Sequence, residues 1–249
     1  MLCRHTLNQF HGLRKGLKPH FGKDNKMRVL FCNIAWMDYY KGRIDGVDEP
    51  KNGGSYVVET GRANEEYNFS PYDLGAESGY PAGEYCLGFV ETKHGNGRTS
   101  NQLKIERIEG CEALVKEGEA ENVLVVFCAL YPDSTKKETY VVGWYKNATV
   151  SRYYYDMEFA VPDSESFYQT YNIIAKKEDC VLLPRPLRRK TIWRVSRSRR
   201  GVTYGFGQAN VWFAEGAAGN PDLKAFLERI EKQIGEYRGE NWVDRYPDA

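Results

Sequence analysis

The stretch at residues 138–155, ETYVVGWYKNATVSRYYY, constrains the fold more than any other part of the chain. Residues 139–142 are β-branched or aromatic, and a second β-rich run covers residues 148–155, so both halves favour strands. Gly143 interrupts the first run, as glycine often does at a bulge or where a ligand or another backbone approaches closely. The simplest interpretation is a β-hairpin whose aromatic side chains pack in the core of a sheet.

The four residues after Gly143 allow a second interpretation. Trp144, Tyr145, Lys146 and Asn147 combine aromatic ring faces, a positive charge and an amide that can both donate and accept hydrogen bonds. This combination suits a nucleobase stacked in a pocket beside a phosphate. For a single aromatic residue, packing in the core is the commoner role. For the group as a whole, the sequence favours a base pocket.

The composition is that of a globular protein rich in β-structure. Aromatic residues make up 14% of the 249 residues, and 18 of them are Tyr, which favours strands. The first 26 residues are basic and show little periodicity, so we expect a flexible N-terminal arm at 1–26 and one α+β domain at 27–249. The chain is expected to be a monomer.

The cysteines and the hydropathy indicate a cytoplasmic location. The six cysteines are scattered and form no Cys-x-x-Cys pair, as is usual for buried free thiols in a reducing compartment. No apolar run approaches the roughly 20 residues that span a bilayer. We therefore expect no membrane partner.

The pattern of apolar residues predicts the remaining elements. Strands are expected at 28–35, 55–59, 85–91, 103–108 and 123–130, with a further strand at the end of 201–214. Residues 167–177 fit either a short helix or a strand. Asn220 can cap a helix whose first residue is Pro221 and whose apolar residues recur at helical spacing to residue 237. The predicted fold is α+β, with a curved or barrel-like, mostly antiparallel sheet and a C-terminal amphipathic helix.

A basic block at residues 185–200, RPLRRKTIWRVSRSRR, contains no acid although the net charge of the chain is only +1. Such a block predicts a polyanionic partner at one face, and the alternative is a solvated loop. The predicted nucleic-acid contacts are Lys146, Arg185, Arg188, Arg189, Lys190, Arg194, Arg197, Arg199, Arg200, Gln208 and Asn210.

Several kinds of catalysis are excluded or weakly supported. Beyond residue 20 the only histidine is His94, which argues against Ser-His-Asp and Cys-His catalysis. No nucleotide-binding glycine motif and no zinc-binding cysteine pair is present. Neither a metal nor a cofactor is therefore expected. Asp73 with Glu91 and Lys93 weakly matches the metal site of restriction-type nucleases, which remains a minor alternative.

One carboxylate lies in a setting suited to base excision. Asp38 is surrounded by the aromatic residues of WMDYY, residues 36–40. A carboxylate beneath an extruded nucleotide can stabilise an oxocarbenium-like sugar or activate water. Asp45 and Glu59 are rival candidates for this catalytic role, and a solvated loop acid is the commoner alternative for each of the three.

Four strings of residues together resemble a known family. They are LFCNIAWMDYYKG, VVGWYKNATV, VLLP and GQANVWFA. The set is similar to PUA-like (EVE, YTH and ASCH) modified-base-binding domains of bacterial phage-defence and modification-dependent restriction proteins, and the resemblance covers most of residues 27–237. It implies a pseudo-barrel with an aromatic pocket for a flipped base. The pocket residues would be Trp36, Tyr39, Tyr40, Trp144, Tyr145, Asn147 and Trp212.

The sequence thus leads to three functional hypotheses. The first is recognition of modified phage DNA by flipping a modified base into an aromatic pocket. The second is a DNA glycosylase that excises such a base, for example a hypermodified cytosine, because the chain is longer than a minimal PUA-like barrel and has room for catalysis of its own. The third is RNA binding through the same pocket.

Overall fold

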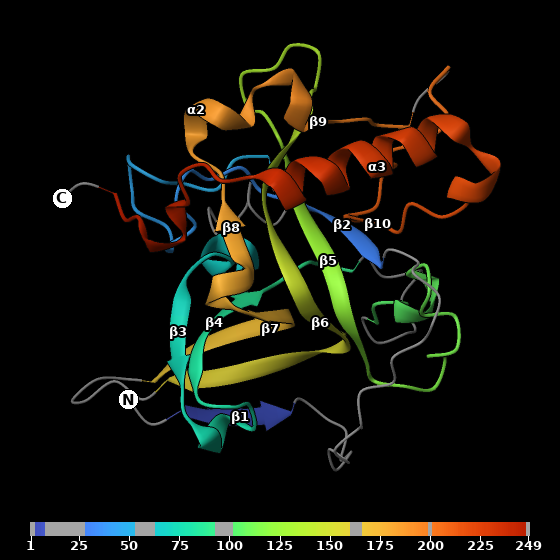
Figure 1. The fold of residues 1–249 in the computed structure, drawn as a ribbon. Coiled ribbons are helices and arrows are strands. Elements are labelled where there is room, and N and C mark those ends of the chain that lie inside the picture. Colours follow the sequence, from blue (N-terminus) through green and yellow to red (C-terminus); the bar gives the residue numbers. More distant parts are fainter. Residues whose placement is uncertain are drawn as a thin grey trace.

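The computed structural model describes residues 3–7, 28–52, 63–92, 102–159, 166–198 and 201–247. The predicted strand at 55–59 and the residues Glu59, Arg199 and Arg200 lie outside these ranges. The fold is α+β, with one large, open and mostly antiparallel sheet and few helices (Figure 1). The strands are β1 Cys3–Leu7, β2 Val29–Ile34, β3 Pro71–Leu74, β4 Gly83–Gly88, β5 Glu119–Leu130, β6 Thr139–Phe159, β7 Phe167–Lys176, β8 Cys180–Leu182, β9 Arg194–Val195 and β10 Val211–Trp212.

The helices of the described residues are short except for one. The α-helices are α2 Arg185–Arg188 and α3 Pro221–Glu236. The 3-10 turns are η1 Asn64–Tyr67, η2 Ala76–Ser78, η3 Ile105–Arg107, η4 Lys177–Asp179, η5 Thr191–Trp193, η6 Ala217–Gly219 and η7 Trp242–Asp244. Asn220 caps α3, because its side chain accepts a hydrogen bond from the backbone N–H of Leu223 at 3.1 Å.

Strand β6 is the centre of the sheet. The strand order is β10-β2-β5-β6-β7-β4-β3, and β1, β8 and β9 also pair with β6. All of these pairs are antiparallel except β2 with β5. Residues 139–155 of the stretch predicted as a hairpin therefore belong to a single strand of 21 residues. It is long enough to pair with β5, β8 and β9 at its start and with β7 and β1 at its end.

A bulge and a glycine shape the middle of β6. Between the pairs Val125 with Tyr145 and Val123 with Ala148, β6 has one residue more than β5, and Asn147 adopts a left-handed φ of 48°. Such a bulge bends and twists a strand. At Gly143, an added Cβ would lie 2.4 Å from the carbonyl oxygen of Val181 and 2.6 Å from the ring of Phe69. Glycine is needed there because another backbone, that of β8, lies close.

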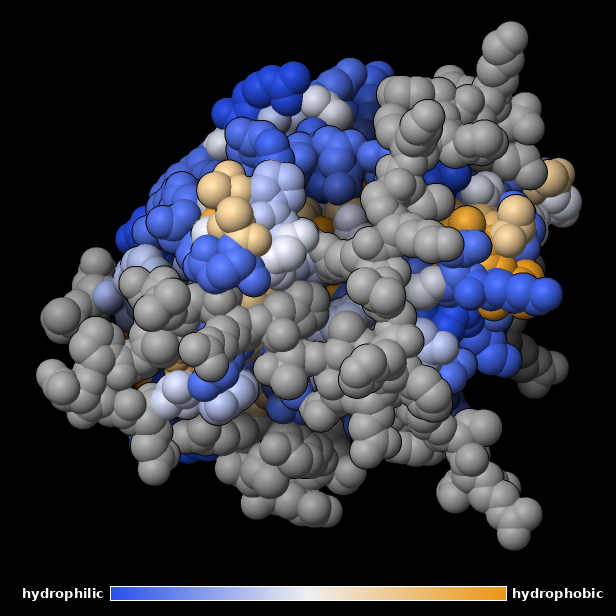
Figure 2. Space-filling model, turned by 90° about the horizontal axis from the view of Figure 1, so that it is seen from below, coloured by the Kyte–Doolittle hydropathy of each residue, from blue (hydrophilic) through white to orange (hydrophobic). Residues whose placement is uncertain are grey.

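Two faces of the sheet bury separate clusters. Helix α3 covers one face and buries Phe226, Leu227 and Ile230 against strand residues that include Phe31 and Trp144 (Figure 1). The other face is covered by loops and 3-10 turns, which bury a larger cluster around Phe127 and Tyr145. From below (Figure 2), most of the described surface is hydrophilic, and apolar residues form only small patches.

The strand predicted at residues 103–108 is wrong. Residues 103–108 are not a strand but surround η3, and Leu103 donates a backbone hydrogen bond to Arg152 at 2.8 Å. The buried Arg152 side chain in turn donates to the carbonyl oxygens of Glu117 and Leu114, both at 3.0 Å. These hydrogen bonds pair backbone polar groups of the loop, so the loop needs no partner strand. In the segment predicted as a flexible arm, residues 3–7 form β1, which pairs with the end of β6.

Candidate functional site

The loop after β2, residues 35–41, is held by a buried carboxylate. One oxygen of Asp48 accepts the backbone N–H of Asp38 at 2.6 Å, and the other accepts those of Tyr39 at 2.8 Å and Tyr40 at 3.2 Å. Burial raises the pKa of Asp48, whereas the three N–H donors act to lower it. Asp48 thus fixes the backbone N–H donors of this loop, and no pattern in the sequence distinguishes it from the neighbouring loop acids.

The same loop is held from the other side by Arg188, the last residue of α2. Its fully buried guanidinium donates hydrogen bonds to the carbonyl oxygens of Leu183 at 2.7 Å, Met37 at 2.6 Å and Asp38 at 2.6 Å. It also lies 5.7 Å from the ring centroid of Trp36. Because Arg188 is buried, its predicted contact with nucleic acid is wrong, and the residue instead attaches α2 to the loop.

A cavity of about 480 Å³ opens where this loop, the end of β5 and α2 meet. We call it the Trp36 cavity, and its lining consists of Trp36, Tyr131, Arg185, Pro186, Arg189 and Lys190. The rings of Trp36 and Tyr131 meet edge to face with centroids 5.2 Å apart, and the Arg189 guanidinium lies 4.4 Å from the centroid of Tyr131. Trp36 is buried, with 4% of its surface exposed, so Tyr131 supplies the accessible ring of the cavity. This ring beside three cations suits a planar ligand that carries negative charge.

Asp38 is linked to this cavity by an ion pair with Arg185, which is one of the lining residues. One Asp38 oxygen is 3.1 Å from the Arg185 guanidinium, and its side chain is 16% exposed. The other oxygen is buried and has no hydrogen-bond partner among the described residues. The two rivals for a catalytic role differ: Asp45 is 85% exposed and pairs with Arg43 at 2.7 Å, and Glu59 lies outside the described residues. Of the described candidates, Asp38 alone adjoins a cavity-lining residue.

Trp144 and Tyr145 do not form a base pocket. As neighbours in a strand they point to opposite faces, and both are fully buried. Trp144 packs 5.5 Å from the ring of Trp193 on the α3 face, while Tyr145 packs 4.8 Å from Phe127 on the other face. Neither side chain has an exposed ring face, so the prediction that they stack on a base is corrected to packing in the core.

The other predicted pocket residues also lie elsewhere. Trp212 is half-buried and stacks on Phe31 at 4.7 Å on the α3 face. Tyr39 stacks on Trp242 at 5.3 Å. The buried Tyr40 donates its hydroxyl to the Ala35 carbonyl at 2.7 Å. Trp36 is thus the one predicted pocket residue that lines the cavity among those described.

The polar residues that the sequence predicted around the pocket lie away from the Trp36 cavity. Asn147 is exposed and donates to Asp179 at 3.1 Å, and Lys146 beside it is half-buried. Gln208 is exposed, and the half-buried Asn210 lies 3.4 Å from a carboxylate oxygen of Glu91. None of the four lines the Trp36 cavity.

The basic block divides between three environments. Arg185, Arg189 and Lys190 are exposed and line the Trp36 cavity, whereas Arg188 is buried. Arg194 and Arg197 line a different cavity beyond η5. The sequence identified the basic members of the Trp36 cavity but missed Tyr131 and Pro186. A signal for Tyr131 existed, because it directly follows the apolar strand predicted at 123–130.

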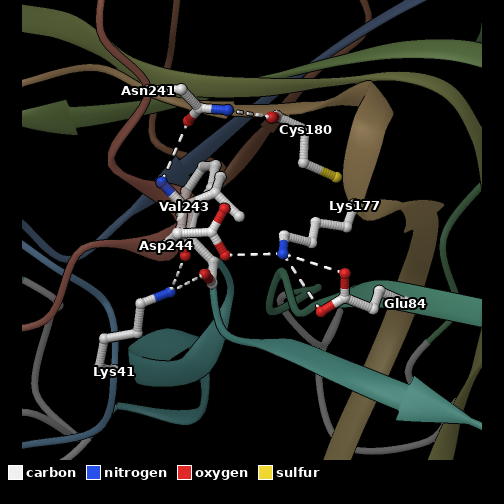
Figure 3. Close-up of polar contacts among 8 residues, drawn as sticks. Lys41, Glu84, Lys177, Cys180, Asn241, Val243 and Asp244 are labelled. Carbon is white, nitrogen blue, oxygen red and sulfur yellow. Dashed lines mark hydrogen bonds and ion pairs between the residues drawn. The ribbon is translucent and has the colours of Figure 1, made fainter.

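A third cavity lies under the C-terminal segment, residues 241–247, and its surroundings include an unusual lysine (Figure 3). Lys41 donates to the carbonyl oxygens of Phe69 and of Val243, the latter at 2.6 Å. Lys177 bridges Asp244 at 2.7 Å and Glu84 at 3.0 Å. Burial lowers the pKa of Lys41 to about 8. These bonds attach the C-terminal segment to the sheet.

Within the described residues, no group of three or more His, Cys, Asp or Glu side chains is placed to hold a metal ion. No helix of the described part is both long and apolar enough to cross a membrane. Comparison of the chain with protein families, with curated proteins and with solved structures found no match.

Proposed function

We propose that the protein binds nucleic acid and receives one base in the Trp36 cavity. The observation that supports this most is the lining itself, in which Trp36 and Tyr131 lie beside Arg185, Arg189 and Lys190. A base stacked on an aromatic ring gains about 1–3 kcal/mol, and the exposed cations can pair with the flanking phosphates. The volume of about 480 Å³ lies within the roughly 300–1,000 Å³ typical of ligand pockets.

The favoured ligand is modified DNA with the modified base flipped out of the duplex, and the context is cytoplasmic defence against phage. This part of the proposal rests on the four strings that resemble PUA-like domains, one of which contains Trp36. The buried free cysteines, Cys32, Cys86, Cys111, Cys128 and Cys180, fit a reducing compartment. Under this proposal the cavity replaces the pocket that the sequence suggested around Trp144.

A glycosylase is the second candidate because of Asp38. Its carboxylate is held 3.1 Å from Arg185, a residue that lines the cavity. If a nucleotide phosphate takes Arg185 as its partner, the Asp38 carboxylate becomes available beside the sugar. It can then stabilise positive charge on the sugar as the bond to the base breaks. In this case Asp38→Asn removes the charge and abolishes the appearance of abasic sites.

Fluorescence polarisation with labelled duplexes tests the proposal. The set contains cytosine, hydroxymethylcytosine and glucosylated hydroxymethylcytosine at one position, together with an RNA of the same sequence. Tyr131→Leu removes a ring face from the cavity, and we expect it to weaken binding of the preferred duplex by roughly tenfold to a hundredfold. Arg189→Met is expected to weaken all duplexes and to reduce the log–log salt slope by about 0.9 for each lost phosphate contact.

Lys232→Met is the matched control, because Lys232 is an exposed cation of α3 outside the Trp36 cavity. It should bind as the wild type does. Unchanged affinity in Tyr131→Leu would place the base elsewhere, and preference for the RNA would favour the RNA-binding hypothesis. Assays for abasic sites on the same duplexes separate a reader from a glycosylase.

A further inference from the structure

A second basic cavity, of about 410 Å³, lies between the turn before β6, the segment η5–β9 and helix α3. We call it the Arg197 cavity. Its lining includes five basic side chains and one acid, Glu138; the basic residues are Lys136, Lys137, Arg194, Arg197 and Arg229. The concentration of one sign of charge in a concave space attracts anions.

Arg197 is enclosed by this cavity, and its hydrogen-bond partners among the described residues are all neutral. It is half-buried, and one guanidinium nitrogen donates to the Thr139 hydroxyl at 3.0 Å and lies 3.5 Å from the Asn33 amide oxygen. No carboxylate among the described residues pairs with it. Burial lowers the pKa of Arg197, as expected when a charge loses water without gaining an opposite charge. The Thr139 and Asn33 contacts fix the guanidinium and leave further N–H donors.

Arg229 approaches the same cavity from α3 and is also without a carboxylate among the described residues. It donates to the Ile192 carbonyl and to the Gln233 side chain at 3.2 Å, and its guanidinium lies 5.2 Å from the Phe226 ring centroid. The single acid, Glu138, is already shared. Its two oxygens lie 3.5 Å from Arg194 and 2.9 Å from the Tyr140 hydroxyl. The acid therefore cannot neutralise Arg197 and Arg229 as well.

We propose that the Arg197 cavity is a phosphate-binding site, in which Arg197 and Arg229 supply fixed donors and Lys136 and Lys137 supply mobile charge at the rim. Guanidinium groups match the geometry of phosphate oxygens and bind them in pairs. The phosphate has two possible sources, a small phosphorylated ligand or the backbone of a nucleic acid. The inference concerns phosphate alone and does not depend on a base entering the Trp36 cavity.

Isothermal titration calorimetry with inorganic pyrophosphate tests the site directly. A hydrogen bond to a charged group contributes about 1.5–3 kcal/mol, so Arg197→Met should weaken pyrophosphate binding by roughly tenfold to a hundredfold. Arg197→Lys keeps the charge and should retain a larger part of the affinity. Arg229→Met should also weaken binding. Lys232→Met is the matched control on the same helix, since Lys232 is exposed and outside this cavity.

The outcomes separate the two sources and the two proposals. If pyrophosphate binds and a single-stranded oligonucleotide competes only in proteins that retain Arg197, the source is a nucleic acid backbone. If pyrophosphate binds without competition, the source is a small phosphorylated ligand, and the site stands even if Tyr131→Leu shows that the base cavity is misplaced. If folded wild type fails to bind millimolar pyrophosphate, or if Arg197→Met binds it unchanged, the phosphate site is refuted.

Discussion

At the scale of single residues, Arg188 and Arg189 show how neighbours in one basic block acquire different roles. Arg188 is fully buried and donates to three backbone carbonyls, while Arg189 is exposed against Tyr131. Both residues stand in a run without acids, so the sequence alone assigned both to nucleic acid. The distinction arises from the tertiary position of the loop at residues 35–41, which no local pattern encodes.

Replacement of each arginine by methionine tests this division. Arg188→Met should lower the free energy of unfolding by about 3 kcal/mol or more, because three carbonyl oxygens lose a charged donor in a buried place. Arg189→Met makes the same change in charge at an exposed position and should alter stability by less than about 0.5 kcal/mol. Urea denaturation followed by tryptophan fluorescence measures both. Equal stability in the two variants would mean that Arg188 does not hold the loop.

At the scale of elements, the sequence predicted strands better than it predicted their partners. Runs rich in β-branched residues gave the positions of β2, β5 and most of β6, because burial on a sheet selects such side chains. The same reasoning failed at residues 103–108. Leu103, Ile105 and Ile108 are buried there, but they belong to a loop that wraps around Arg152. Apolar residues reveal burial, but only pairing decides whether a buried segment is a strand.

Strand β6 also changes the role expected of Asn147. The sequence suggested that its amide reads a base edge, whereas the structure places it at a bulge with a φ of 48°. Asparagine and glycine tolerate this left-handed conformation, and a β-branched residue does not. Asn147→Gly should therefore keep nearly wild-type stability, while Asn147→Val should lose about 1–2 kcal/mol.

Chemical denaturation of the two variants and duplex binding by Asn147→Gly measure both consequences. We expect binding and base preference to be unchanged, because Asn147 does not line the Trp36 cavity. Loss of discrimination between bases in a stable Asn147→Gly protein would instead support the base-reading role that the sequence suggested.

At the scale of the whole molecule, the candidate site is assembled from segments far apart in the chain. The loop at 35–41 supplies Trp36, and Tyr131 directly follows β5. Of the cations, Arg185 lies in α2, and Arg189 and Lys190 directly follow it. The sequence identified Trp36 and the basic residues from their chemistry. It could not exclude Trp144 and Tyr145 from the pocket. In a sequence, an aromatic residue of the core and one of a pocket look alike until the face of the strand that each occupies is known.

The C-terminal segment shows the same long-range assembly and leads to a prediction about pH. Lys41, from the loop at 35–41, binds the Val243 carbonyl at 2.6 Å, and the charged groups that influence it are Asp244 and Lys177, with the Cys86 thiol nearby. Burial lowers the pKa of Lys41 from 10.5 to about 8. Between these two values the unfolded chain holds a proton that the folded chain has released.

Stability must then rise with pH across this window. Below about pH 8 both states are protonated, so the contribution of Lys41 is constant there. Between about pH 7.5 and 9.5, the free energy of unfolding of wild type relative to Lys41→Met should increase by about 1–2 kcal/mol. Comparison with Lys41→Met removes the titration of tyrosines and cysteines that the two proteins share. A flat difference for Lys41→Met would mean that Lys41 keeps its ordinary pKa beneath the C-terminal segment.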